Sequence, residues 1–412
     1  MFKAGLDPNF NRFWTGESLA QFAVQLGTIA LPIISVQLLH ASEAQLGYLN
    51  AASTAAFLVL GLPAGAWVDR WLKRPTLIAA NLTRAIAVSA VPVLYFTGSL
   101  QLWHLYIVAA VVGLATVFFD VAYQSFIPIL VGVHRIGRAN SRMEASVQLA
   151  RLAGPSIGGL LLKVLAAPVL LGAVGVGYLI SSIFLIATHD KEKSLRRPPT
   201  RERNLWAEIR EGLSYVVHSA PISRITLANL LSSVAYTFAM TLVPLVVLRL
   251  IGMTSFQYGL SMAVGAAGGL VGASLSGRLT AKYGTADVVR FSALGATVML
   301  LAYPLALLAA DSRPLAMGII FTLGFLGNIA VLIYNITQVS LRQRLCPLPL
   351  LSRMNASVRF IVWGAMPISA LAAGWLSTAL GITTILWVMV LLGLVSAVPL
   401  WRISRHLPAD IH

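Results

Sequence analysis

One carboxylate near the middle of a long apolar stretch is the residue of this chain best placed for chemistry. Asp120 lies about ten residues from the end of the stretch 103–130, which is roughly 15 Å along a helix and close to the centre of a bilayer. An acid there is costly to keep charged, so it could take up and release a proton. Alternatively it is a structural acid paired with a buried arginine, for which Arg84 and Arg151 are available.

Two further acids are candidates for proton coupling. Glu17 lies near the start of the stretch 12–38, where it is either a proton or cation site or a solvated side chain. Glu144 follows Ser141 at the spacing of a capping box, which predicts that the pair opens a helix at about residue 143. Arg151 comes two turns after Glu144 on nearly the same face, so it could meet an anionic molecule, Asp120 or an internal partner.

A set of aromatic and amide side chains could line a cavity. Polar groups inside an apolar pocket suit an amphipathic molecule. The sequence shows no cluster of metal-binding residues, no phosphate-binding Gly-Lys loop and no nucleophile motif, so we expect no metal, no cofactor and no enzymatic activity. With Arg151, the cavity candidates are Tyr123, Gln124, Tyr334, Asn335 and Gln338.

The composition places these residues in a membrane. Hydrophobic residues make up 58% of the chain and charged residues 11%, whereas a soluble domain carries about 25% charged residues. Mean hydropathy is +0.81. The sequence predicts an all-α integral membrane protein with twelve spans, each long enough to cross about 30 Å of hydrocarbon. The spans are 12–38, 46–68, 76–97, 103–130, 143–165, 168–188, 222–250, 258–279, 287–310, 314–340, 353–379 and 382–402.

The net charge of +16 is an orientation signal. Basic residues gather in alternate connections, and only Lys163, Arg249 and Arg313 fall on the other side. The positive-inside rule therefore predicts that both termini are cytoplasmic. Because the charge is distributed in this way, we expect no binding to nucleic acid.

A long internal repeat divides the chain. The segment 141–147 returns as 352–358 with six of seven positions identical, at a spacing of 211 residues, and Pro32 pairs with Pro244 after a one-residue slip. Two parallel halves of an apolar chain are typical of secondary transporters. We predict an N-terminal six-helix bundle (1–188), a cytoplasmic linker with an amphipathic helix (189–221) and a C-terminal six-helix bundle (222–412). That helix lies at the membrane surface or packs on the inner ends of the bundle.

The segment after the second span carries glycines, an acid and three cations. Its pattern, read along Gly61, Gly65, Asp69, Arg70, Lys73 and Arg74, resembles the signature of the major facilitator superfamily, although Leu72 stands where that family usually has a glycine. The resemblance implies two six-helix bundles related by a pseudo-twofold axis. It also implies that Asp69 gates the transporter by meeting the positive end of another span. We expect Lys73 and Arg74 to face the cytoplasm.

The fifth span holds Gly154, Pro155, Gly158 and Gly159, which resemble the Gly-Pro element of antiporters in this superfamily. Together with 119–125 and 139–141, this element is similar to the branch of macrolide efflux pumps and enterobactin exporters. The resemblance implies proton-driven export of small amphipathic molecules by a monomer in the bacterial inner membrane, in contact with membrane lipid. The alternatives are siderophore export and a non-transporting membrane scaffold or sensor.

Overall fold

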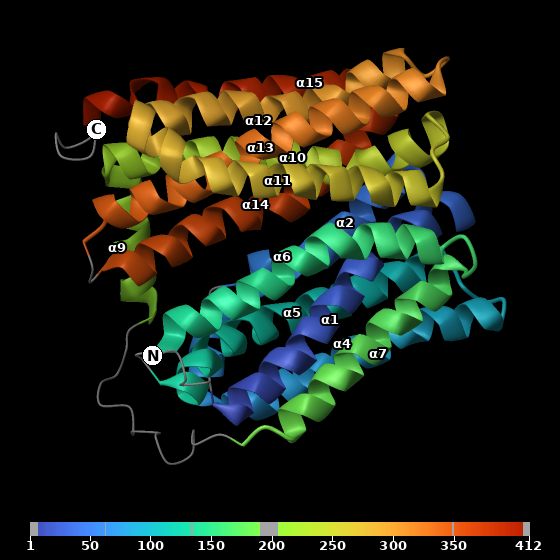
Figure 1. Cartoon of the computed structure of the whole chain (residues 1–412), viewed down its shortest axis with the longest axis horizontal. Helices are drawn as coiled ribbons and strands as arrows, with labels where there is room; N and C mark the ends of the chain where they lie inside the picture. The colour runs from blue at the N-terminus through green and yellow to red at the C-terminus, as the bar shows by residue number, and fades with distance from the viewer. Residues whose placement is uncertain (1–6, 62, 133–134, 190–204, 348–349, 407–412) are drawn as a thin grey trace. The chain divides into compact units, whose positions relative to one another are not determined.

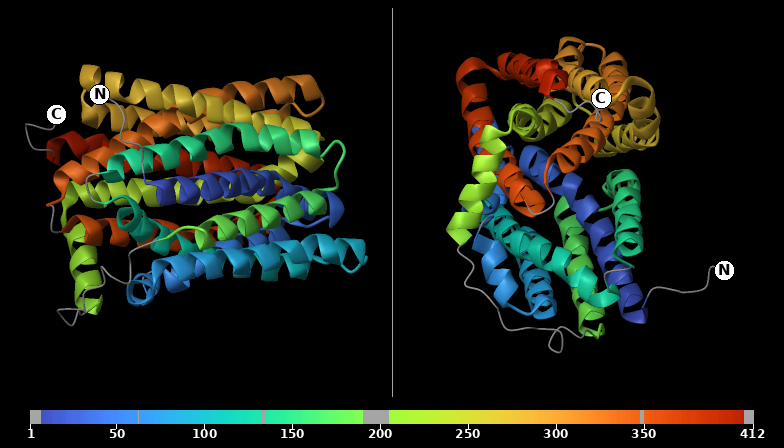
Figure 2. Two further views of the ribbon diagram at one scale, coloured as in Figure 1. Left: turned by 60° about the horizontal axis from the view of Figure 1, so that its bottom comes forward. Right: turned by 90° about the vertical axis from the view of Figure 1, so that its left-hand side faces the viewer.

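The structure is a computed structural model, and it describes residues 7–61, 63–132, 135–189, 205–347 and 350–406. Every described element is helical. Contacts group the chain into two compact units, one of Met1–Leu39 with Ala55–Arg203 and one of His40–Thr54 with Asn204–His412. In each unit the long helices run alongside one another (Figures 1 and 2).

The first unit is built from the helices of the first half of the chain, one of which belongs to it only in part. A π-helical turn (Ile34–Leu38) continues the first helix. The second helix straddles the two units, because its first twelve residues group with the second unit. The helices are α1 (Pro8–Ile33), α2 (Glu43–Leu60), α3 (Pro63–Arg70), α4 (Lys73–Phe96), α5 (Leu102–Val131), α6 (Ile136–Leu161) and α7 (Ala167–Ile186).

The second unit repeats this order. Its first long helix is followed by the π-helical turn Val246–Leu250, and the chain ends its described part in the 3₁₀ helix Val398–His406. The helices are α9 (Leu205–His218), α10 (Ala220–Leu245), α11 (Ser255–Tyr283), α12 (Thr285–Leu308), α13 (Arg313–Leu345), α14 (Leu351–Leu380) and α15 (Ile382–Ser396).

The helices account for the predicted spans. Within the described residues, ten are long and apolar enough to cross a membrane. The other two predicted spans coincide with α2 and α6, which are shorter or more polar. The predicted span 46–68 is broken, because α2 ends at Leu60 and Pro63 opens α3 at the helix position that proline prefers.

One predicted helix start is wrong. The capping box of Ser141 and Glu144 was expected to open the fifth span, but α6 begins at Ile136. Both residues therefore lie inside the helix, where backbone N–H groups already have helical acceptors. Glu144 instead accepts a hydrogen bond from Gln148 Nε2 one turn later (2.6 Å).

The amphipathic helix α9 packs on α14. A Cβ added to Gly212 would lie 2.7 Å from the backbone oxygen of Arg353, so only glycine allows this approach. Glu211 forms an ion pair with Arg353, and Tyr215 donates to the Leu345 carbonyl (3.1 Å). Val216 is buried against Met354 and neighbouring residues. Of the two predicted positions, the structure therefore has the helix packed on the bundle.

Glycines bring the backbones of α11 and α13 into contact. A Cβ on Gly268 or Gly272 would collide with the carbonyl groups of Phe325 or Ile329, whereas nothing lies within 4 Å of the same position on Gly277. Small residues four apart are the usual means of such close approach in membranes.

We expect Gly272→Ala to destabilise the protein by about 1–3 kcal/mol, because the added methyl group meets backbone that has no rotamer to change. The matched variant Gly277→Ala, in the same helix, should leave stability unchanged or raise it, since alanine is the better helix former. Thermal unfolding in detergent compares the two. Equal melting temperatures would contradict the packing described here.

Candidate functional site

The first unit buries an acid inside its helix bundle. Glu17, on α1, is only 3% exposed, and its burial removes the possibility of a solvated side chain. Gln21 Nε2, one turn along the same helix, donates to Glu17 Oε1 (2.8 Å). Ser181 Oγ on α7 donates to the other carboxylate oxygen (3.4 Å). A buried carboxyl group requires such partners, so this one has a defined position.

A buried guanidinium group faces this acid. Arg84, on α4, is 6% exposed, and its charged carbon lies 4.0 Å from the centroid of the Phe119 ring and 4.4 Å from that of Tyr178. The two rings attract the cation through their faces. Arg84 also donates to Asn81 Oδ1, and its Nε atom has no hydrogen-bond partner within the described residues.

Hydrogen bonds join the acid to the guanidinium. Asn81 Nδ2 donates to Ser181 Oγ (2.9 Å), and Ser181 in turn donates to Glu17. Arg84 additionally acts on Glu17 through its charge. The network therefore links α1, α4 and α7, whose close packing holds it in place.

The predicted midplane acid belongs to the same cluster. Asp120 follows Phe119 on α5, is half-buried and interacts electrostatically with Glu17. Tyr123, also half-buried, has a hydroxyl group that is influenced by the charges of three acids, Glu17, Glu144 and Asp120. The cluster thus contains one guanidinium and two carboxyl groups, with Glu17 influenced by the charges of both Arg84 and Asp120, and we name it the charged cluster: Glu17, Asn81, Arg84, Asp120 and Ser181.

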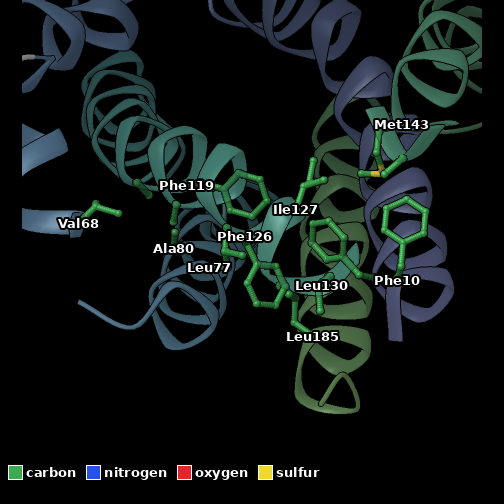
Figure 3. Packing of buried hydrophobic residues seen from close by; sticks show 14 residues of the cluster. Phe10, Val68, Leu77, Ala80, Phe119, Phe126, Ile127, Leu130, Met143 and Leu185 are labelled. Atoms are coloured by element: carbon green, nitrogen blue, oxygen red, sulfur yellow. The ribbon is translucent and has the colours of Figure 1, made fainter. Parts of the chain in front are cut away.

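An apolar core adjoins the charged cluster. Phe13 lies 5.8 Å from the ring of Tyr123 and 5.4 Å from that of Phe126. Phe119, which stacks on Arg84, is itself a member of this core. Figure 3 shows Phe126 and neighbouring buried side chains of this core, which is packed hydrocarbon that Phe119 connects to the charged cluster.

The second unit has a neutral counterpart. Tyr334 donates to Asn229 Oδ1 (2.7 Å), and Asn229 Nδ2 donates to Gln338 Oε1 (3.1 Å). Tyr334 and Gln338 are buried between α10 and α13, where these bonds pair the Tyr334 hydroxyl and the Gln338 side-chain oxygen. Arg342, one turn further along α13, is buried as well.

The repeat shows what differs between the halves. Both ends of α10 lie 212 residues after the corresponding ends of α1, and the two helices contain 26 residues each. The ends of α12 lie 212 residues after those of α4 as well. The same interval relates Glu17 to Asn229 and Arg84 to Ala296. The acid and the cation of the first unit are therefore both replaced in the second, one by an amide and one by a methyl group.

The remaining candidates lie on helix surfaces. Glu144 and Arg151 on α6 are exposed, as are Gln124 on α5 and Asn335 on α13. Of the two arginines offered as partners for Asp120, Arg84 is buried and Arg151 is exposed. Among the described residues, no group of His, Cys, Asp and Glu side chains could hold a metal ion.

The basic turn after α3 is more ordered than predicted. Lys73 was expected to face the cytoplasm, but it is 7% exposed and donates to the carbonyl groups of Val68 (2.7 Å) and Trp71 (3.0 Å). The unpaired carbonyl groups at the end of a helix stabilise a cation there, which explains why the Lys73 side chain folds back.

The other residues of the motif differ in burial. Arg74 donates to the carbonyls of Leu185 (2.8 Å) and Ile186 at the end of α7. Gly61 and Arg70 are exposed, whereas the burial of Gly65 and Asp69 lies outside what the structure describes.

We expect Lys73→Gln to lower the free energy of unfolding by about 1.5–3 kcal/mol, the usual contribution of hydrogen bonds from a charged group. The control is Arg344→Gln, which removes an exposed cation at the end of α13. Thermal unfolding in detergent measures both. A melting temperature of Lys73→Gln equal to that of the control would show that the buried amine contributes nothing.

The Gly-Pro element packs α6 on α1. A Cβ on Gly158 would lie 2.7 Å from Ile29 Cδ1, and one on Gly154 would collide with Gln25. Pro155 and Gly159 are buried beside them. The element thus allows close packing next to the helix that carries Glu17.

Sequence reasoning missed the uncharged partners. Asn81, Ser181 and Asn229 are single polar residues in apolar stretches, and neither their type nor their spacing indicates which helix they face. The repeat was the available signal, because extending the Pro32–Pro244 interval to Glu17 points directly at Asn229.

Comparison with known proteins gives the family. The profile of the Major Facilitator Superfamily matches residues 13–360. Macrolide efflux protein A of Streptococcus pyogenes is 24% identical over 277 residues, which are 65% of this chain and 66% of that protein. The multidrug efflux pump Tap of Mycolicibacterium fortuitum is 35% identical over 122 residues, 28% of this chain and 29% of the pump. The chain thus matches slightly under two thirds of the macrolide efflux protein and a smaller part of Tap.

Solved structures agree on the fold. A bacterial homologue of the iron transporter ferroportin superposes with a TM-score of 0.75 at 16% identity, covering 96% of this chain and 98% of that one. The D-xylose-proton symporter superposes with a TM-score of 0.69 at 15% identity, covering 95% and 97%. The profile match over residues 13–360, together with the spanning helices, shows that the chain is a multi-pass membrane transporter, not an enzyme, and that it belongs to the Major Facilitator Superfamily.

Proposed function

We propose that this protein exports small amphipathic molecules across the bacterial inner membrane by proton antiport, in alternating-access steps, as a monomer with both termini in the cytoplasm. The observation that carries the proposal is the charged cluster of the first unit. It contains two carboxyl groups and one buried guanidinium within the membrane-spanning helices, and Glu17 is influenced by the charges of the other two. Intramembrane ionisable groups of this kind mark proton relays and ion pathways.

The count of charges explains how a proton could compete with cargo. With both carboxyl groups ionised, Arg84 balances only one of them, and the cluster carries one net negative charge. One proton on Asp120 or Glu17 makes it neutral. Because an uncompensated charge in a low-dielectric bundle is costly, proton binding and the approach of a cationic or strongly polar cargo become alternatives. An antiporter requires that the proton and the cargo do not bind at the same time.

Asp120 is the better carrier of the exchanged proton. It is half-buried, whereas Glu17 is almost fully buried and already accepts two hydrogen bonds. We assign to Glu17 the role of holding Arg84 in place. Glu144, which is exposed and bonded to Gln148, has the weakest support of the three acids.

The cargo class follows from the relatives and from the exposed polar groups. Macrolide and multidrug efflux proteins are the relatives found by sequence. Gln124, Asn335 and Arg151 are exposed polar side chains on spanning helices and remain the proposed cargo contacts, with Tyr123 beside the charged cluster. Siderophore export is the second candidate within transport. In the proposal no cofactor or nucleic acid takes part, and the basic turn of Gly61 to Arg74, with Asp69, acts as the gate.

Purified protein in liposomes under an imposed pH gradient tests the proposal. With the cytoplasmic face outward and a panel of macrolides, cationic dyes and siderophores outside, accumulation of at least one compound should follow acidification of the interior and stop with a protonophore. Uptake of siderophores alone would favour the second candidate. No gradient-dependent movement of any compound would favour a scaffold or sensor.

A further inference from the structure

A groove on the first unit lies apart from the charged cluster. It has a volume of about 630 Å³ and runs between α4 and α5. Its walls include the small residues Thr76, Ala79 and Ala115, and at one end the rings of Trp71 and Phe118 lie 5.6 Å apart. Sites for small organic ligands occupy roughly 300–1,000 Å³ and are mostly apolar. The groove therefore has the size and the lining of a binding site.

The groove opens toward lipid. Beyond it, the outward faces of the same two helices carry exposed apolar side chains: Ile86 and Val93 on α4, and Ile107 and Leu114 on α5. Ile86 is 72% exposed. In helices that span a membrane, such apolar faces meet hydrocarbon, because the bilayer is their solvent. Leu114 also lines the groove, so the groove and the lipid-facing surface are continuous.

The length of the groove is close to the thickness of one leaflet. On α4 its lining runs from Pro75 to Thr83, which is roughly 12 Å along the axis at about 1.5 Å per residue. Half of a hydrocarbon core of about 30 Å is only slightly longer. A single acyl chain of one leaflet thus fits lengthwise.

The end of the groove nearest Trp71 carries positive charge. Arg70, Lys73 and Arg74 flank Trp71, and Trp71 is 47% exposed, as is usual for tryptophan at the level of lipid headgroups. Basic residues at that level attract anionic headgroups. Arg70 is exposed, while Lys73 and Arg74 add their charges although they donate to backbone carbonyls.

We propose that this groove binds an anionic phospholipid, with one acyl chain between α4 and α5 and the phosphate group beside Arg70. The lining does not suit the exported molecule. Thr76 and Thr83 provide its hydroxyl groups, and the Thr76 hydroxyl is already donated to the Leu72 carbonyl (2.8 Å). Recognition of a polar cargo needs several directed polar groups, whereas an acyl chain needs none.

Photo-crosslinking in nanodiscs tests the lipid site on the full-length protein. The probes are phosphatidylglycerol and phosphatidylcholine with the same diazirine-bearing acyl chain, and labelled peptides are located by mass spectrometry. We expect phosphatidylglycerol to label 71–83 and 111–118 more than phosphatidylcholine does. Peptides around Phe291, an exposed residue of α12, should be labelled equally by both. Each nanodisc leaflet has the same lipids, so the result depends neither on orientation nor on transport.

Paired variants separate a bound lipid from the general lipid shell. Ala79→Phe fills the groove and should reduce its labelling to that of the Phe291 region, while Ile86→Phe, on the same face of α4 but outside the groove, should not. Arg70→Gln should lower the preference for phosphatidylglycerol about fivefold, the effect of one lost cation, and Arg344→Gln should leave it unchanged. Circular dichroism and melting temperature confirm that each variant is folded.

Three results would overturn the lipid site. Equal labelling of the groove by the two lipids would mean that no anionic headgroup is recognised. Unchanged labelling in Ala79→Phe would mean that the chain lies elsewhere. Displacement of both lipids by an added macrolide would assign the groove to cargo.

Discussion

Asp120→Asn is expected to reduce pH-driven export to the level of protein-free liposomes. The amide keeps the size of the side chain but has no proton to exchange at any physiological pH. Because Asp120 interacts with Glu17 beside Arg84, its neutral replacement also fixes the net charge of the cluster at zero. The protein should still insert, fold and bind cargo, with an affinity that no longer depends on pH. The measurements are transport in proteoliposomes and cargo binding in detergent across pH 5–8.

The matched control for Asp120→Asn is Glu144→Gln. Glu144 is an acid on a neighbouring spanning helix, but it is exposed and bonded to Gln148, so its replacement should leave coupling intact. Full proton-driven export by Asp120→Asn would reject the assignment. A large loss of thermal stability in Asp120→Asn, with coupling kept in the molecules that remain folded, would identify a structural ion pair instead.

The largest effect on stability is expected for Arg84→Ala. Removing one partner of a buried charge pair costs about 3–5 kcal/mol, because the other charge remains without compensation. Here the stranded group is Glu17, which is 3% exposed and held by Gln21 and Ser181. The variant should therefore unfold at a much lower temperature than the native protein, or fail to accumulate in the membrane.

A double variant distinguishes the lost charge from the lost packing. Glu17→Gln with Arg84→Ala copies the neutral chemistry of Asn229 and Ala296 in the second unit. It should recover most of the stability that Arg84→Ala loses. If the double variant is as unstable as the single one, then the contacts of Arg84 with Phe119 and Tyr178 matter more than its charge. Its transport should remain impaired, because the charged cluster then lacks its cation.

The sequence predicted the helices well and their contacts poorly. Length and hydropathy depend on each span alone, which is why all twelve spans have a helix in the structure. Helix ends were less predictable: the basic and polar residues from Arg138 to Arg142 read as a loop, yet α6 contains them. A helix can carry polar residues on an exposed face, and hydropathy does not separate that case from a loop.

The partners of the charged cluster were beyond sequence reasoning for a geometric reason. Asn81 and Ser181 are 100 positions apart, and they meet only because α4 and α7 pack in one particular register. A rotation of either helix by one residue, about 100°, would separate them. Lys73 illustrates the same limit at short range. Its charge was evident, but whether the amine reaches water or the end of α3 depends on the turn that follows Arg70.

The π-helical turns at Ile34–Leu38 and Val246–Leu250 affect how either half can be re-engineered. Each follows a proline, Pro32 or Pro244, at the same place in its unit. A π turn accommodates one residue more than an α turn, so side chains at its end are rotated by about 100° from the helical pattern before it. Grafts, tags or crosslinks designed on α1 or α10 by uninterrupted heptad spacing would therefore point into the wrong neighbour past these prolines. Because the two turns are themselves 212 residues apart, the alignment of one half with the other runs through them without a gap.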